Sequence, residues 1–189
     1  MRAAANAELL YPLASRGEPI LFLEPSCLSA VCEDASDLLS GESRAKAQVV
    51  AQASALFEDW VERAYQSGKA AVTLRQGQAT TILLHGHCHQ KAMGLVASAK
   101  ALLSRVPGAT VVDLDAGCCG MAGSFGYGRD HYDVSRTIGE RRLLPAARGL
   151  DSASVLVASG VSCRHQVEDF TGTRPLHPAE LLSALAEHQ

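Results

Sequence analysis

Four short apolar segments of this chain run directly into cysteines, and this pattern constrains the fold more than any other feature. The segments and their cysteines are Ile20–Leu23 with Cys27, Thr80–Leu84 with Cys88, Ala109–Leu114 with Cys118 and Cys119, and Ser154–Ala158 with Cys163. Each segment has the length and composition of a strand and is followed by a helix-like stretch. The carboxyl ends of parallel strands share one sheet edge, where ligands bind. Five thiols are therefore expected at one crevice, and a cluster of thiols is typical of a soft metal centre.

Helical patterns alternate with these strands, which predicts an α/β fold with a mostly parallel sheet flanked by helices. The longest helical pattern is Ala45–Gln66, in which apolar residues recur every three or four positions. The other expected helices are Ala3–Ser15, Lys91–Val106, Asp130–Arg148 and Pro178–Glu187.

The bulk composition indicates a small globular protein. A chain of 189 residues with 47% apolar residues can bury one core, and a net charge of -3 favours neither nucleic acid nor an acidic membrane surface as a partner. No segment approaches the ~20 apolar residues of a membrane span, and the N-terminus makes a poor signal peptide. Six cysteines are too few for a disulfide scaffold in a chain of this size, so we expect reduced thiols in the cytoplasm.

The densest motif is the glycine-rich stretch 117–127, which contains the adjacent cysteines Cys118 and Cys119. Adjacent cysteines form a disulfide poorly but can both bind iron, because each iron of a cluster needs its own thiolate. Glycines allow tight bends and let amide N–H groups approach an anionic cluster. The alternative interpretation is a glycine-rich turn with two buried thiols.

A second dense motif places three histidines around Cys88, at positions 85, 87 and 89. Imidazole and thiolate are both good zinc ligands, so a zinc site is one interpretation. We favour a supporting role in which His87 and His89 donate hydrogen bonds to cluster sulfurs or cap the next helix. His85 is expected to be a strand-end residue whose hydrogen bonds are satisfied.

Two further residues receive a structural interpretation. Cys32 lies five residues after Cys27, and we expect it to be a buried or half-buried thiol rather than a ligand. His177 precedes Pro178, so it lies either at a loop-to-helix junction or near the edge of the cluster.

Four ordered motifs resemble one family. Taken together, Glu24-Pro25-Ser26-Cys27, His87-Cys88-His89, Cys118-Cys119-Gly120 and Ser162-Cys163-Arg164-His165-Gln166 are similar to the cysteine-rich (CCG) domain. That domain occurs in the B subunit of heterodisulfide reductase, the glycolate oxidase iron–sulfur subunit and the C subunit of anaerobic glycerol-3-phosphate dehydrogenase. The likeness is strongest to the C-terminal part of FAD-linked oxidases fused to an iron–sulfur module, and it covers nearly the whole chain.

The resemblance implies an iron–sulfur cluster of the [4Fe–4S] type that transfers electrons. The family's metal-binding cysteines correspond to Cys88, Cys118, Cys119 and Cys163, with Cys27 as a fifth cofactor-binding candidate. Heterodisulfide-reductase members end in Cys-x-x-Cys, whereas position 166 here is glutamine. This departure favours a simple electron relay over disulfide-cleaving chemistry.

The resemblance also implies partners. Such domains occur as tandem halves, and residues 1–189 correspond to a single CCG half-domain in which 1–18 form a leading helix and linker. The expected partners are a flavin-containing oxidase domain or subunit, which would hold the FAD, and a ferredoxin-like iron–sulfur domain, with self-association as a further option. The chain would be part of an oxidoreductase without a complete active site, so we assign no catalytic residue. Its expected location is cytoplasmic, with peripheral attachment at the inner membrane face as an alternative.

Two other classes of function fit the same residues. One is a zinc-stabilised structural or partner-binding module that uses Cys88, Cys118 and Cys163 with a histidine. The other is a thiol–disulfide redox protein in which Cys118 or Cys119 pairs with another strand-end cysteine. Metal and sulfide analysis distinguishes these classes from an iron–sulfur protein.

Overall fold

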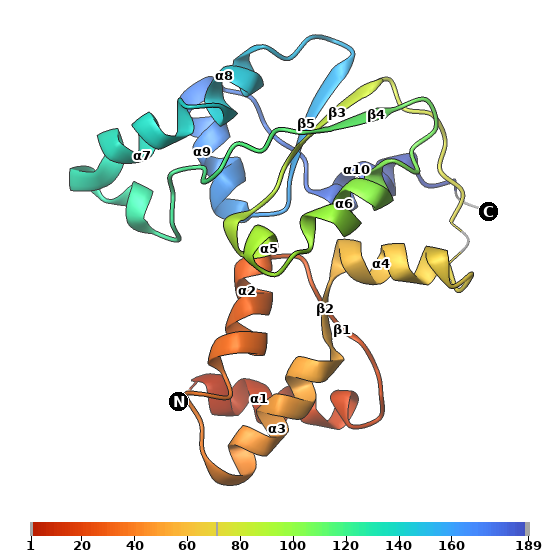
Figure 1. Ribbon diagram of the computed structural model, residues 1–189, viewed down its shortest axis with the longest axis vertical. Coiled ribbons are helices and arrows are strands. Elements are labelled where there is room, and N and C mark those ends of the chain that lie inside the picture. Colours follow the sequence, from red (N-terminus) through yellow and green to blue (C-terminus); the bar gives the residue numbers. More distant parts are fainter. Residues whose placement is uncertain (1, 71, 188–189) are drawn as a thin grey trace.

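Two parallel sheets organise the chain, and the computed structural model describes residues 2–70 and 72–187 (Figure 1). The first sheet pairs β1 (Ile20–Phe22) with β2 (Ser54–Leu56). The second sheet has the strand order β4–β3–β5, with β4 at Thr110–Asp113, β3 at Thr81–His85 and β5 at Ser154–Ala158. The predicted α/β class with parallel strands and flanking helices is confirmed. The first strand, which we expected beside the other three, belongs to a separate sheet.

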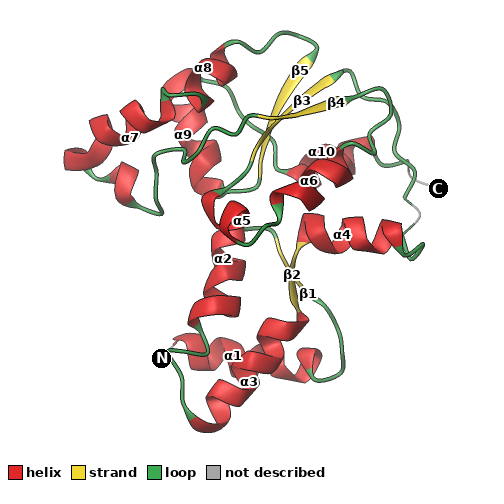
Figure 2. Ribbon diagram, viewed as in Figure 1, coloured by secondary structure: helices red, strands yellow, loops and turns green. Residues whose placement is uncertain are grey.

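Helices make up most of the remaining structure (Figure 2). They are α1 (Arg2–Ala14), α2 (Pro25–Ser29), α3 (Gly41–Ala53), α4 (Phe57–Gln66), α5 (Cys88–Ala92), α6 (Val96–Leu103), α7 (Tyr132–Gly139), α8 (Leu143–Arg148), α9 (Val161–Thr171) and α10 (Pro178–Leu185). A π-helical turn, Ala30–Asp34, continues α2, and two 3₁₀ turns, Phe125–Tyr127 and Arg129–His131, precede α7. Within the described residues, no helix has the length and apolarity that a membrane crossing requires.

The three-stranded sheet is covered by helices on both faces. Side chains alternate along each strand, so Ile82 and Leu84 pack with α6 and α10 on one face. Leu156 and Ala158 of β5 point to the other face and pack with α8 and α9. The cysteines at 119 and 163 belong to this second core, so the site begins inside packed structure.

The small sheet overturns one prediction. The expected helix Ala45–Gln66 is interrupted, because α3 ends at Ala53 and the next three residues form β2. These residues pair in parallel with β1, and Leu56 is fully buried. The apolar pattern of residues 54–56 is compatible with a helix and with a strand, and pairing with the distant strand β1 selects the strand.

Other predicted helices are also divided. The pattern over Lys91–Val106 becomes α5 and α6, separated by Gly94 with a φ of 72°. Asp130–Arg148 becomes a 3₁₀ turn, α7 and α8. Helices α2 and α9, which were absent from the expected element order, both begin just after a strand and carry a cysteine in their first turn.

The order of the strands defines where a ligand can bind. β3 is central, β4 follows it on one side, and β5 crosses to the other side. The helix after β3 and the helix after β5 cover opposite faces of the sheet. In open α/β sheets, a crevice forms between two neighbouring strands whose following helices cover opposite faces, here at the carboxyl ends of β3 and β5. This crevice is where such sheets bind ligands.

Candidate metal centre

Four cysteines lie at the carboxyl end of the three-stranded sheet. Cys88 is the first residue of α5 after β3, Cys118 and Cys119 lie in the loop after β4, and Cys163 lies in the first turn of α9 after β5. The predicted position of these cysteines at strand ends is confirmed. Cys119 and Cys163 are buried, Cys118 is half-buried and Cys88 is exposed, so the group reaches from the core to the surface.

The four thiols form a row in which neighbours interact. Interaction with Cys119 and Cys88 lowers the pKa of Cys118, and interaction with Cys119 lowers the pKa of Cys163 despite its burial. The pKa of Cys88 is raised, chiefly by Cys118, and that of Cys119 is raised by Cys118 and Cys163. Adjacent thiolates repel one another, so some of these thiols keep their protons. A cation among the sulfurs would replace those protons, which is the electrostatic condition for a thiolate metal site.

The backbone around Cys118 and Cys119 requires glycine. Gly120 has a φ of 102°, and a Cβ atom there would lie 2.2 Å from the Ser135 carbonyl oxygen. The Gly120 N–H donates to Cys118 Sγ at 3.3 Å, which stabilises negative charge on that sulfur. The glycine predicted for a tight bend is therefore also a donor to the thiol row.

Gln166 holds the same loop from the other side. Its buried Nε2 donates to the Cys119 carbonyl oxygen at 3.1 Å, and to the carbonyl and hydroxyl oxygens of Ser135 at 3.1 and 2.9 Å. The residue that replaces a cysteine in the Cys-x-x-Cys pattern thus fixes the loop by hydrogen bonds.

His87 has the expected capping role. Its Nδ1 accepts from the His89 backbone N–H at 3.2 Å, and its own backbone N–H donates to the Gln90 side chain at 3.3 Å. His87 Nδ1 also lies 3.9 Å from Cys88 Sγ, whereas exposed His89 stacks on the His87 ring. A Cβ atom at Gly160 would lie 2.3 Å from His87 Cδ2, so this glycine allows the ring to approach the start of α9.

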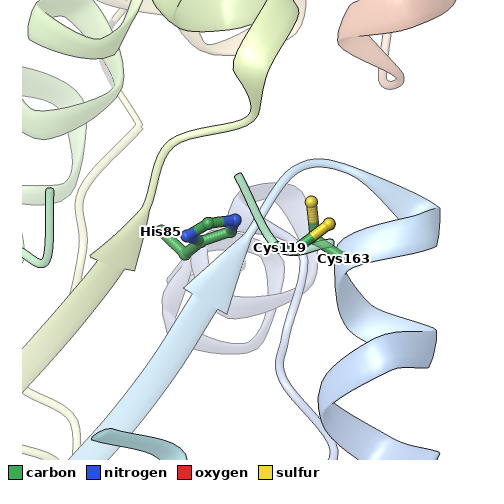
Figure 3. A group of neighbouring side chains, drawn as sticks. All are labelled: His85, Cys119 and Cys163. Carbon is green, nitrogen blue, oxygen red and sulfur yellow. The ribbon is translucent and has the colours of Figure 1, made fainter. Parts of the chain in front are cut away.

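His85 does not match its expected role. The side chain is 1% exposed at the end of β3, and neither ring nitrogen has a hydrogen-bond partner among the described residues. The prediction of a satisfied strand-end histidine is therefore wrong. One ligand atom each from His85, Cys119 and Cys163 lie within 4.8 Å of one another, a spacing that could hold a metal ion (Figure 3).

The other two cysteines, Cys27 and Cys32, lie in the segment that follows β1. Cys27 is exposed on α2, which packs against α5. Cys32 Sγ donates to the Ala51 carbonyl oxygen at 3.7 Å, and burial raises its pKa. This contact agrees with the structural role expected for Cys32.

Glu24 connects the small sheet to the site, a role that the sequence did not reveal. One carboxylate oxygen caps α2 through the Ser26 N–H and hydroxyl at 3.3 and 2.8 Å. The other oxygen accepts from the Val161 N–H at 2.7 Å. A carboxylate therefore occupies the N-terminus of α9, the helix that carries Cys163, where the helix dipole favours negative charge.

A buried carboxyl group contacts the residue that follows β5. Glu58 is fully buried, one of its oxygens accepts from the Ser159 hydroxyl, and the other has no partner among the described residues. Burial raises the Glu58 pKa.

His177 lies at the start of the last helix. Its Nδ1 accepts from the Ala179 N–H at 3.0 Å and caps α10, which confirms its position at a loop-to-helix junction.

The donor chemistry fits a soft metal or an iron–sulfur cluster. Thiolate and imidazole are the ligands such centres use, and here they converge from three chain segments. The orphaned ring of His85 is a feature that a site without a ligand would not require.

Comparison with known proteins agrees with the predicted resemblance. The chain is 26% identical over 170 residues to the C subunit of anaerobic glycerol-3-phosphate dehydrogenase of Escherichia coli strain K12, a match that covers 89% of this chain and 40% of that protein. It is 29% identical over 185 residues to D-2-hydroxyglutarate dehydrogenase of Pantoea ananatis, and 30% over 182 residues to that of E. coli K12. The two D-2-hydroxyglutarate dehydrogenase matches cover 97% and 95% of this chain but 17% of each relative.

The first of these relatives is one of the proteins on which the resemblance rests, so the predicted relationship is confirmed. The chain spans 40% or less of the length of these relatives. No protein-family model matches the chain, and no solved structure matches it.

Proposed function

We propose that this chain is an iron–sulfur electron-transfer module of a flavin-dependent oxidoreductase that acts on a 2-hydroxy acid of the D-lactate or glycolate type. A [4Fe–4S] cluster would be held by Cys88, Cys118, Cys119 and Cys163, with Cys27 as an additional candidate. The cluster would accept electrons one at a time from a flavin unit and pass them on.

The row of thiols carries this proposal. Cys88, Cys118, Cys119 and Cys163 follow the carboxyl ends of β3, β4 and β5, and the sulfurs of Cys119 and Cys163 lie within 4.8 Å of one another. A cluster with four irons needs four protein thiolates, which is the number in the row. The Gly120 N–H adds a hydrogen bond to one of those sulfurs, a contact that tunes the potential of a cluster.

The relatives support a relay rather than a substrate-binding module. The chain matches proteins named for two different substrates, glycerol 3-phosphate and D-2-hydroxyglutarate, over most of its own length. Glycerol 3-phosphate is not a 2-hydroxy acid, so the shared region is better explained by a common electron-transfer step. Substrate choice would then belong to another domain or subunit.

The described residues would have different roles in an electron relay. Cys119 and Cys163, 4% and 1% exposed, would exclude water from one end of the centre, while exposed Cys88 would face a partner at the other end. Gln166 would fix the loop that carries the adjacent cysteines, and His87 would fix the start of α5. A rigid donor set reduces the rearrangement that accompanies a change in cluster charge.

The proposal includes partners and a location. A flavin-containing oxidase domain or subunit would supply electrons, and a ferredoxin-like iron–sulfur domain would be the neighbouring relay. Residues 1–189 would then act as one CCG half-domain in the cytoplasm.

The test is anaerobic purification and reconstitution, followed by iron and acid-labile sulfide analysis and electron paramagnetic resonance of the reduced chain. We expect about four irons and four sulfides per chain. Zinc without sulfide would support the zinc-stabilised module instead. A chain without metal that shows a reversible two-electron thiol couple would support the thiol–disulfide protein.

Cysteine variants provide a matched control. Cys118→Ser should lose most of the reconstituted iron, because a hard hydroxyl replaces a soft thiolate. Cys32→Ser should keep its iron, because that thiol contacts the Ala51 carbonyl group, away from the thiol row. Equal iron loss in both variants would mean that iron binds without a specific site.

A further inference from the structure

His85 is a buried imidazole that the proposed cysteine ligands leave unused. Its ring is 1% exposed, and neither Nδ1 nor Nε2 has a hydrogen-bond partner among the described residues. A buried polar atom without a partner costs about 1–3 kcal/mol, and such atoms in folded proteins call for an explanation. The explanation lies in what the ring faces.

The ring faces two sulfurs of the thiol row. One ligand atom from each of His85, Cys119 and Cys163 lies within 4.8 Å of the other two, and all three residues are buried (Figure 3). The two cysteines come from the loop after β4 and from α9, whereas the histidine ends β3. Three separate segments thus direct one donor each to the same point.

The backbone fixes the ring in this position. His85 pairs with Ala158 in the β3–β5 register, and the following residue, Gly86, turns the chain against α6. A Cβ atom at Gly86 would lie 2.9 Å from Val96 Cγ2, so the turn has no room for a side chain. A ligand held at a strand end by a paired backbone is preorganised for metal binding.

We propose that His85 is itself a metal ligand, which binds through one ring nitrogen beside Cys119 and Cys163. The centre then has a mixed thiolate–imidazole donor set: because each iron of a four-iron cluster takes one protein ligand, the imidazole replaces one of the four thiolates, at the buried end of the centre. This assignment rests on the proposed function and deepens it, because it names a ligand of the centre that the cysteine motifs do not contain. Imidazole and thiolate occur together in zinc sites and in iron–sulfur centres.

A cobalt titration tests the assignment without relying on a cluster. Co²⁺ is added to the full apo chain under anaerobic, reducing conditions, and the thiolate and ligand-field absorption bands are followed. In His85→Phe the affinity for Co²⁺ should fall at least tenfold, the scale seen when even supporting residues of a metal site are lost. His131→Phe is the control, because His131 is exposed, carries the same ring and has no role in the site; its affinity should stay within twofold of the original chain.

The stability of the apo variant separates a ligand from a structural residue. A phenylalanine ring has no polar atom that burial would leave without a hydrogen-bond partner. The free energy of unfolding of the apo His85→Phe chain, measured in urea, should therefore equal or exceed that of the original chain. A loss of apo stability together with unchanged Co²⁺ affinity would overturn the assignment.

The unmutated chain gives an independent readout. The chain contains seven histidines, and it can be labelled at these alone with ¹⁵N and reconstituted with iron and sulfide. Pulsed electron paramagnetic resonance of the reduced centre should show a directly bound nitrogen that is absent from labelled His85→Phe. The absence of such a nitrogen from the original chain would overturn the assignment even if the variant failed to fold.

The outcomes keep this inference separate from the proposed function. A chain that retains iron and sulfide without nitrogen coupling refutes the His85 ligand and leaves the electron relay intact. A chain that binds Co²⁺ through His85 but never retains sulfide refutes the relay and leaves the mixed donor set.

Discussion

Replacing Gln166 by methionine should weaken the fold at the loop that carries Cys119. Methionine keeps the length and approximate volume of glutamine but has no N–H group. The variant therefore removes the hydrogen bonds from Nε2 to the Cys119 carbonyl oxygen and to both oxygens of Ser135 without opening a large cavity.

The magnitude follows from the contacts. Leaving the buried Cys119 carbonyl oxygen without its side-chain partner costs about 1–3 kcal/mol, and the lost bonds to Ser135 add about 1 kcal/mol. We expect the free energy of unfolding of Gln166→Met to fall by about 3 kcal/mol. In a chain of this size that loss lowers the melting temperature by roughly 6–12 °C.

Urea denaturation of the apo chain, followed by far-ultraviolet circular dichroism, measures this loss. Gln52→Met is the control, because Gln52 is an exposed helical residue; it should change the free energy by less than about 0.5 kcal/mol. The double variant with Ser135→Ala should show a coupling energy between the two sites of about 0.5–1 kcal/mol. A Gln166→Met chain as stable as the control would refute the claim that this amide fixes the loop.

Three further outcomes follow from the site. Because burial raises the Glu58 pKa above its usual 4.5, the folded chain binds that proton more tightly, so the free energy of unfolding should fall as pH rises from about 4.5 through the raised pKa. Glu58→Gln should flatten this fall in pH-dependent urea titrations, and an unchanged slope would contradict it. Gly160→Ala should cost about 1–3 kcal/mol, because its Cβ would lie 2.3 Å from His87 Cδ2, whereas Gly149→Ala, with no contact under 3.4 Å, should be nearly neutral in the same assay. Metal loading should raise the melting temperature of the chain in calorimetry, since a ligand that binds only the folded state stabilises it, and identical melting curves would argue against a built site.

Local sequence signals predicted the strands better than the helices. Each of β1, β3, β4 and β5 coincides with a short apolar run, and such runs depend little on distant residues. β2 was missed because its Leu56 also continues the helical pattern of α3, and only pairing with β1 selects the extended conformation. Non-local pairing of this kind leaves no signature in a single segment.

The candidate site likewise has features that local sequence predicts and features that depend on distant residues. The cysteines were placed by the strand ends that precede them, because chain direction alone sends those ends to one edge. The orphaned ring of His85 could not be foreseen, since a histidine in an apolar strand looks the same with or without a partner. Gln166 was recognised only as a departure from Cys-x-x-Cys, and its hydrogen bonds to Ser135 depend on the placement of α7 against α9.

The spread of the candidate donors along the chain would set the time at which the proposed centre forms. The first donor lies at residue 85 and the last at residue 163, with a strand crossover between each pair of segments. During synthesis, ions that meet Cys88 or Cys118 early find at most part of a site, because α9 leaves the ribosome after every other donor-bearing segment. Insertion of the proposed cofactor would therefore follow the docking of α9, and whatever delivers the metal would meet a nearly finished fold instead of a nascent chain.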